Sequence, residues 1–212
     1  RDVRDIANIH DEDTMSRLIE LLAYRTASLL NINNLAQELG VQRETTEKYL
    51  SILERLFLIR RLPAWHRNHA KRLIKSPKIH IVDSGLAATL SKLTPADWLT
   101  QSTEFGHLLE SFVLQQITCQ ASVLDDELRL THYRDKDQVE VDIVIEQGRG
   151  VWGVEVKKAV TVDTKKDGAG LKRLADRAGK DFRGGVLLYG GNHVLPLDVE
   201  KSFACPIGSL WH

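Results

Sequence analysis

The first third of the chain places apolar residues at the spacing of α-helices. Helices are predicted from residue 11 to about 30, from 33 to 39 and from 45 to 56, with Gly40 ending the second one before a tight turn. Residues 57–62 and 78–82 are then predicted as strands. Two helices joined by a short glycine-containing turn, with two strands after them, indicate a winged helix-turn-helix up to about residue 83.

The second half of the chain has a different pattern. Residues 105–120 carry an apolar stripe typical of one long helix. Three strands are predicted at 128–134, 139–146 and 151–157, followed by a helix at 171–178 and a glycine-bounded strand at 184–191. The order helix, three strands, helix, strand predicts an α/β sandwich. Proline and polar residues at 92–102 indicate a linker, so two domains are expected, 1–98 and 99–212.

The strands at 139–146 and 151–157 are predicted to pair as a hairpin around Gln147 to Gly150. If Glu146 lies opposite Val151, then Asp142 falls opposite Glu155, with Cβ atoms roughly 4.5–5.5 Å apart. Two carboxylates that close repel each other and favour a hard cation between them, Mg²⁺ or Mn²⁺. Lys157 is expected on the same face, where it would neutralise a developing negative charge. The plain alternative is the solvated face of a charged hairpin.

The segment between the two wing strands is strongly basic. From residue 60 to residue 78 there are seven Lys or Arg and no acid. Such a patch attracts phosphate without reading sequence. The expected DNA contacts are five residues of this patch and four of the third helix: Arg67, Lys71, Arg72, Lys75, Lys78, Arg43, Thr45, Thr46 and Lys48. The alternative is a loop that docks on an acidic surface of another domain.

Composition limits the class of protein. The chain has 212 residues, 29 basic and 29 acidic, so nucleic-acid binding depends on local patches. Two separated cysteines fit a reducing compartment and argue against zinc. Neither an apolar run long enough for a membrane span nor a secretion leader is visible, and we expect a cytoplasmic protein. No phosphate-binding G-x-x-x-x-G-K-[ST] loop is present. The first residue is Arg, which suggests a piece of a longer chain.

Asp142 followed by Glu155-Val156-Lys157 resembles the active-site core of the PD-(D/E)xK nuclease superfamily, with Val141 where that pattern has proline. Several short segments add to this resemblance: Lys75–Lys78, Asp83–Leu86, Gly106–Glu110 and Leu210–Trp211. Together they look like the C-terminal region of a family of bacterial and archaeal AAA-type ATPases, although Trp65 departs from an expected proline. The resemblance implies an α+β two-domain chain. An N-terminal winged helix-turn-helix would precede an α/β restriction-endonuclease-like domain.

The resemblance also implies a site and partners. Asp142 and Glu155 would hold Mg²⁺ or Mn²⁺, Glu110 would support the metal or a water, and Lys157 would help activate the nucleophile of a DNA endonuclease. Glu110 has an alternative as an ordinary helix glutamate with its tip in water. ATP would enter only through an upstream ATPase domain, the partner of this region. Membrane partners are not expected, and self-association stays open. The alternative function is a non-catalytic DNA- or protein-binding module that regulates the ATPase.

Overall fold

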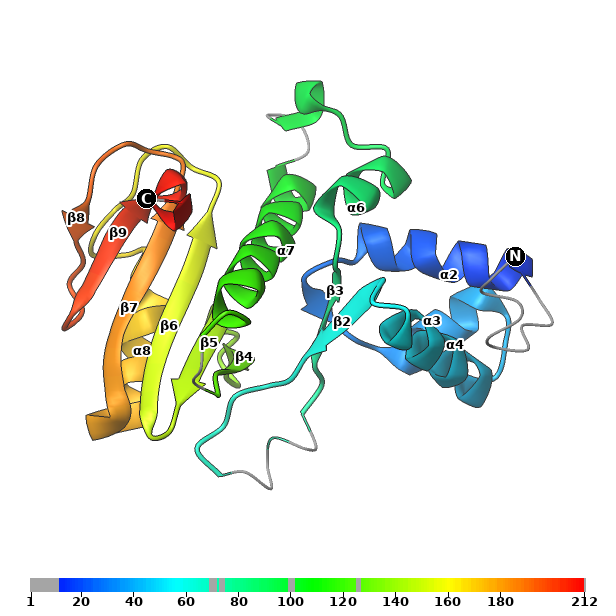
Figure 1. The fold of residues 1–212 in the computed structure, drawn as a ribbon, viewed down its shortest axis with the longest axis horizontal. Coiled ribbons are helices and arrows are strands. Elements are labelled where there is room, and N and C mark those ends of the chain that lie inside the picture. The colour runs from blue at the N-terminus through cyan, green and yellow to red at the C-terminus, as the bar shows by residue number, and fades with distance from the viewer. Residues whose placement is uncertain (1–11, 69–71, 73–74, 99–101, 125–126, 212) are drawn as a thin grey trace. The chain divides into compact units, whose positions relative to one another are not determined.

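The computed structural model describes residues 12–68, 72, 75–98, 102–124 and 127–211 (Figure 1). The chain divides into two compact units, and each of them is discontinuous in sequence. The first unit contains Arg1–Arg61 and Lys78–Ser111, and the second contains Leu62–Pro77 and Phe112–His212. Residues 62–77 therefore belong with the C-terminal half of the sequence, and 99–111 with the N-terminal half. The predicted domains, 1–98 and 99–212, are each continuous in sequence and so do not include this crossing of segments between the two units.

Helices dominate the first unit, and a small sheet accompanies them (Figure 1). The helices are α2 (Glu12–Tyr24), α3 (Ile32–Leu39), α4 (Arg43–Arg55), α6 (Ser84–Leu90) and the first part of α7 (Ser102–Ala121), with η1 (Pro95–Trp98) a 3₁₀ turn. The sheet has the strand order β1 (Ser28–Leu29), β3 (Lys78–Ile81), β2 (Ile59–Leu62).

Local sequence explains the ends of α3. The Asn31 side chain accepts a hydrogen bond from the Asn34 backbone N–H at 3.1 Å, which satisfies a donor of the first turn. Gly40 ends the helix with φ 71°, a left-handed conformation that favours glycine. Helices α2, α3 and α4 then bury one apolar face each around a common core, which includes Leu18, Leu22, Leu35, Leu50 and Leu53.

The first helix is shorter than the prediction. It ends at Tyr24, whereas the helical spacing of apolar residues extended to Leu29–Leu30. Residues 28 and 29 instead form β1, which pairs antiparallel with β3 through Ser28↔Ile79. Two adjacent leucines, Leu29 and Leu30, fit the end of a helix as well as a short strand. Only the pairing with β3 selects the strand.

The second unit is a six-stranded mixed sheet with a helix on each face. Its strand order is β4 (Arg129–Arg134), β5 (Glu140–Gln147), β6 (Gly150–Lys157), β7 (Phe182–Tyr189), β9 (Ser202–Pro206), β8 (Leu195–Pro196). The remaining elements are α8 (Ala169–Ala178), η2 (Gly179–Asp181), η3 (Ile207–Trp211) and the second part of α7.

The two faces of this sheet have separate apolar cores. Leu171 and Leu174 of α8 pack with Val144 and Val151 on one face. Val113 and Leu114 of α7 pack with Ile143, Val154 and Leu188 on the other. Burial on both faces explains why the sheet strands are rich in valine and isoleucine.

Strands β8 and β9 were absent from the prediction. β9 pairs parallel with β7, with Leu187 opposite Ala204, and β8 pairs antiparallel with β9. Only β8 is at the edge of the sheet, and it has two residues; β9 buries the small residues Ser202 and Ala204 and exposes Phe203, so neither strand shows the apolar alternation that marks the central strands. Among the described residues, no helix has the length and apolar character needed to cross a membrane.

Candidate functional site

The β5–β6 hairpin has the predicted register. Glu146 lies opposite Val151, and the pairing continues to Ile143 opposite Val154. The turn itself is shorter than expected, since only Gly148 and Arg149 lie outside the strands, with Gly148 at φ 57°. Type I′ and II′ turns of two residues need such positive φ values, which explains the glycine.

Asp142 lies at an irregularity in β5. The register between β4 and β5 shifts between Thr131 and Tyr133, where three steps of β5, from Val144 to Val141, match two steps of β4. Val141 and Val144 both pack into the core beneath α8, whereas Ile143 packs into the opposite core. Strict alternation therefore fails around Asp142, as it does at a β-bulge.

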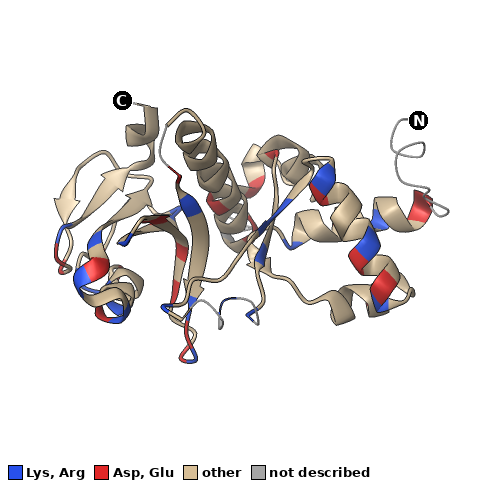
Figure 2. Ribbon diagram, turned by 60° about the horizontal axis from the view of Figure 1, so that its bottom comes forward, with Lys and Arg blue, Asp and Glu red and all other residues tan. Residues whose placement is uncertain are grey.

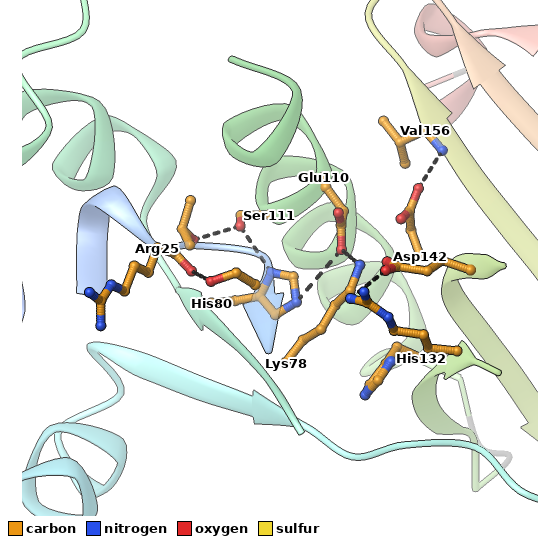
Figure 3. A network of polar contacts seen from close by, with 12 residues as sticks. Arg25, Lys78, His80, Glu110, Ser111, His132, Asp142 and Val156 are labelled. Atoms are coloured by element: carbon orange, nitrogen blue, oxygen red, sulfur yellow. Dashed lines mark hydrogen bonds and ion pairs between the residues drawn. The ribbon is translucent and has the colours of Figure 1, made fainter. Parts of the chain in front are cut away.

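The Asp142 carboxylate bonds to the backbone of the neighbouring strand. Its Oδ2 accepts a hydrogen bond from the Val156 N–H at 2.9 Å (Figure 3). The described cross-strand pairs run only to Ile143 and Val154, one position short of the predicted pair of Asp142 with Glu155. The two carboxyls are nonetheless electrostatic neighbours, because the charge of Asp142 contributes to the pKa of Glu155.

Glu155 is buried beneath the first turn of α8, with 9% of its surface exposed. Its Oε1 accepts a hydrogen bond from the Leu171 N–H at 2.9 Å, one of the donors that the first turn of a helix leaves without a helical partner. Gly170 permits this approach, since a Cβ there would lie 2.3 Å from Glu155 Oε1 and 2.1 Å from the Glu140 carbonyl oxygen. Burial, and then the charge of Asp142, raise the pKa of Glu155 to about 8.

Lys157 is half-exposed and forms an ion pair with Asp167, in the loop before α8. Asp167 also accepts the Asp163 N–H at 2.8 Å. Burial alone raises the pKa of Asp167, but the bonds from Lys157 and from the Asp163 backbone outweigh it, and the pKa is lowered. The sequence analysis did not identify Asp167 as the partner of Lys157. The one available signal was its position in the loop that follows the strand with Glu155 and Lys157.

Glu110 belongs to the first unit, on α7. Lys78 Nζ donates to Glu110 Oε1 at 2.8 Å, and both side chains are buried (Figure 3). His80 Nε2 lies 4.0 Å from the same oxygen, and its Nδ1 is 2.9 Å from Ser111 Oγ. Glu110 is therefore a buried partner of a lysine, which differs from the wet-tipped surface glutamate that was the alternative.

The side-chain chemistry of Glu155 and Asp142 fits a divalent cation. Two neighbouring carboxyls, one of them with a raised pKa, form an oxygen donor set that a hard cation stabilises in ionised form. Glu155 uses Oε1 for the helix, which leaves Oε2 to meet a cation. Within the described ranges, no group of three or more His, Cys, Asp or Glu side chains converges as a metal site. A cation here would keep several waters, as Mg²⁺ commonly does.

Several residues of the predicted basic patch have partners inside the protein. Arg72 forms a bidentate ion pair with Glu146 of β5, with both N···O distances 2.7 Å. Lys75 Nζ donates to the Arg134 carbonyl oxygen at 3.0 Å, and Lys78 is buried beside Glu110. Arg72 thus meets an acidic partner, as in the alternative of a docked loop, but Glu146 belongs to the same unit and not to another domain. Arg67 is exposed, and Lys71 lies outside the described residues.

Helix α4 presents only part of its predicted DNA-binding set. Arg43 and Lys48 are exposed and Thr45 is partly buried. Thr46 is fully buried, and its hydroxyl donates to the Gln42 carbonyl at 3.3 Å, so it stabilises the start of the helix. Acidic and basic positions are interspersed along the helices of the first unit (Figure 2).

Comparison with known proteins places the chain next to families without an assigned role. Residues 105–210 match a domain of unknown function (DUF4143), which is found in C-terminal regions associated with AAA-type ATPases. Residues 1–97 match a second domain of unknown function (DUF8612). These matches lie on either side of the predicted boundary at residue 98.

Two curated relatives are also uncharacterized. Protein Rv2008c of Mycobacterium tuberculosis and protein Mb2031c of Mycobacterium bovis are each 30% identical over 190 residues, which is 87% of this chain and 40% of theirs. The chain thus spans less than half the length of these relatives. The crystal structure of protein VC1899 from Vibrio cholerae is similar over 84% of this chain and 48% of that one, at 14% identity. Its TM-score of 0.32 is too low to support a conclusion about the fold.

Proposed function

This chain belongs to the DUF4143 family, and we propose that its second unit carries a divalent-metal site for hydrolysis of DNA phosphodiesters. The observation that carries the proposal is the buried Glu155 carboxyl, whose pKa is raised to about 8 beside Asp142. A glutamine would accept the same Leu171 N–H without any cost of ionisation. A carboxylate in that position gains from a nearby cation, so its chemistry favours a metal ligand over a purely structural cap.

The roles of the individual residues follow from their positions. Asp142 and Glu155 would hold the metal, which, when bound, lowers the pKa of a coordinated water and polarises the phosphate. Lys157 would turn from Asp167 to the phosphate, where its ammonium stabilises the charge that develops. Glu110, in the first unit, would contribute only on exchanging its bond to Lys78, so we assign it a supporting role.

The wider setting is part of the same proposal. The order of elements α2, β1, α3, α4, β2, β3 is that of a winged helix-turn-helix, which supports DNA as the partner of the first unit. Arg43 and Lys48, two of the residues predicted to contact DNA, are exposed on α4. ATP would act through an upstream domain of a longer, cytoplasmic ATPase, and its hydrolysis would gate the nuclease-like unit. Association of several copies is compatible with this arrangement.

A second function is favoured by a specific observation. Asp142 bonds to Val156, Glu155 bonds to Leu171, and Lys157 bonds to Asp167, so each side chain of the pattern also stabilises the fold. A non-catalytic module that binds DNA or protein and regulates the ATPase needs only these structural roles. The two functions differ in whether a metal binds and whether DNA is cut.

Plasmid nicking in Mg²⁺ or Mn²⁺, together with calorimetric titration of the metal, tests the proposal. We expect nicking and metal binding by the wild-type chain, loss of both in Asp142→Asn, and loss of nicking alone in Lys157→Met. Arg149→Gln, at the exposed hairpin tip, is the matched control and retains both activities. Metal binding without nicking removes catalysis but keeps the site. Absence of metal binding leaves the regulatory module.

A further inference from the structure

A polar cleft lies in the second unit, apart from the carboxylate pair. It is formed by the segment after β2, by strand β4 with the residues after it, and by the end of α8. It has a volume of about 950 Å³, and its lining includes Trp65, Arg67, Lys75, Tyr133, Lys136 and Arg177. None of the four residues proposed for hydrolysis lines it.

Two buried donor groups in this cleft have no hydrogen-bond acceptor among the described residues. They are the indole Nε1–H of Trp65 and the hydroxyl of Tyr133, on side chains that are 3% and 4% exposed. Their rings pack edge to face at 5.9 Å, and the Trp65 backbone N–H donates to the His132 carbonyl at 2.5 Å, so Trp65 is fixed in place. A buried donor without an acceptor destabilises the folded state, and native proteins satisfy most such groups. An acceptor is therefore missing at this position.

The charges around these two groups indicate the kind of acceptor. Lys or Arg side chains line the cleft at four positions, against the carboxylates of Asp135 and Asp176. Asp135 is paired with Arg173, which lies 3.3 Å from its Oδ2, and its Oδ1 accepts backbone N–H groups of residues 137 and 139, although Oδ2 accepts no hydrogen bond from the described residues. Four cationic side chains against two carboxylates leave the lining of the cleft with a net positive charge. Burial raises the pKa of Tyr133, and a hydrogen bond from the Arg177 side chain to its oxygen offsets only part of that rise, so the hydroxyl keeps its proton and can donate.

We propose that this cleft binds a phosphate group, with Trp65 Nε1–H and the Tyr133 hydroxyl as neutral donors and Arg177 and Arg67 as charged ones. A phosphate presents several strong acceptor oxygens and a negative charge, and guanidinium groups match its geometry. The site holds whether or not the chain hydrolyses DNA, because none of its residues belongs to the carboxylate pair. The phosphate belongs either to a free nucleotide or to a nucleic-acid strand.

Calorimetric titrations of the 212-residue chain in EDTA, which excludes metal binding, test the site. The probes are inorganic phosphate, pyrophosphate, a thymidine monophosphate and a short oligothymidylate. The variants are Trp65→Phe and Tyr133→Phe, which remove one donor each and keep the ring, and Arg177→Gln. The matched control is Lys180→Gln, an exposed lysine that does not line the cleft. Circular dichroism melting checks that each variant folds.

We expect at least one phosphate probe to bind, with binding weakened about tenfold by Arg177→Gln and several-fold by each Phe variant, and unchanged by Lys180→Gln. Equal binding of phosphate and the mononucleotide identifies a small phosphate ligand, and tighter binding of the oligonucleotide identifies a strand; both support the site. If no probe binds, or if all three cleft variants bind as the wild type does, the inference is overturned. Loss of nicking in the carboxylate variants has no bearing on these titrations.

Discussion

Among the described residues, each unit of the molecule buries one glutamate, and the charges of these two glutamates are compensated differently. Glu110, in the first unit, is 6% exposed and meets a full positive charge, Lys78 Nζ, at 2.8 Å. Glu155, in the second unit, is 9% exposed and meets the N–H of Leu171 in the first turn of α8. The first carboxylate is part of an ion pair. The second relies on a helix terminus, which is equivalent to about half a charge, and has another acid beside it.

The difference distinguishes a glutamate whose charge is matched from one whose charge is only partly compensated. A buried ion pair with a good hydrogen bond keeps both partners charged and fixes the local packing. A buried carboxyl that is only partly compensated holds its proton to a higher pH, and at neutral pH it would ionise fully only with further positive charge. Functional groups are often of the second kind. Four substitutions test this contrast between the two glutamates.

The largest effect is expected from Lys78→Met. Removing the ammonium leaves the Glu110 carboxylate buried without its lysine, and we expect the free energy of unfolding to fall by about 3–5 kcal/mol. Urea denaturation followed by circular dichroism measures it. Lys48→Met, at an exposed position of the same unit, should change stability by less than about 0.5 kcal/mol. Equal midpoints for the two variants would show that the pair is not structural.

Gly170→Ala should destabilise the second unit by about 2 kcal/mol, because the new methyl overlaps the Glu140 carbonyl and the Glu155 carboxyl. In an ordinary helix position, alanine is favoured over glycine, so even the sign of the change tests the close approach. Thermal melting provides the measurement. Gly208→Ala is the control, since a Cβ there meets no atom within 4 Å. A Gly170→Ala variant more stable than the wild type would contradict the close approach of the Glu155 carboxyl to residue 170.

Glu155→Gln tests the electrostatics through pH. The folded state binds the Glu155 proton more tightly than the unfolded chain does. The contribution of the protonated Glu155 to the free energy of unfolding is therefore complete below pH 4.5 and is lost as the pH rises to about 8. In EDTA, the variant should be close to the wild type at pH 4.5. At pH 8.5 it should be more stable by at least about 1.4 kcal/mol, which corresponds to a tenfold change in proton affinity.

Mg²⁺ sharpens the same experiment. If the proposed site is correct, Mg²⁺ raises the melting temperature of the wild type at pH 8.5 and has a smaller effect on Glu155→Gln. Parallel pH profiles of the two proteins in EDTA would mean that the carboxyl is not strained by burial.

The smallest effect on stability is expected from Lys157→Met. Its ion pair with Asp167 is half-exposed, and such pairs contribute at most about 1 kcal/mol. Chemical denaturation should therefore show a small change, while plasmid nicking is lost. A large loss of stability would mean that Lys157, like Lys78, mainly stabilises the fold.

Much of this fold followed from the chain's own pattern. The apolar spacing of the strands predicted the β5–β6 hairpin, and the glycine in its turn set the register that the structure has. Strands β8 and β9 escaped prediction because β8 has only two residues, and β9 buries small residues, Ser202 and Ala204, while its large apolar side chain, Phe203, is exposed. Register arithmetic also placed Asp142 opposite Glu155, but it assumed an unbroken strand. The extra residue of β5 near Asp142 depends on its pairing with β4, a contact that spacing along β5 does not encode.

The partners of the charged residues were likewise decided by tertiary structure. Local sequence determined where cations are dense, and it could not tell that Arg72 would bond Glu146 or that Lys78 would be buried against Glu110. Helix and strand formation depend on neighbours within a few residues, whereas ion pairs, orphaned donors and shifted pKa values depend on groups brought together from distant positions. For that reason the sequence alone identified an acidic pair and a lysine as candidate chemistry. The folded chain decided what each of them touches.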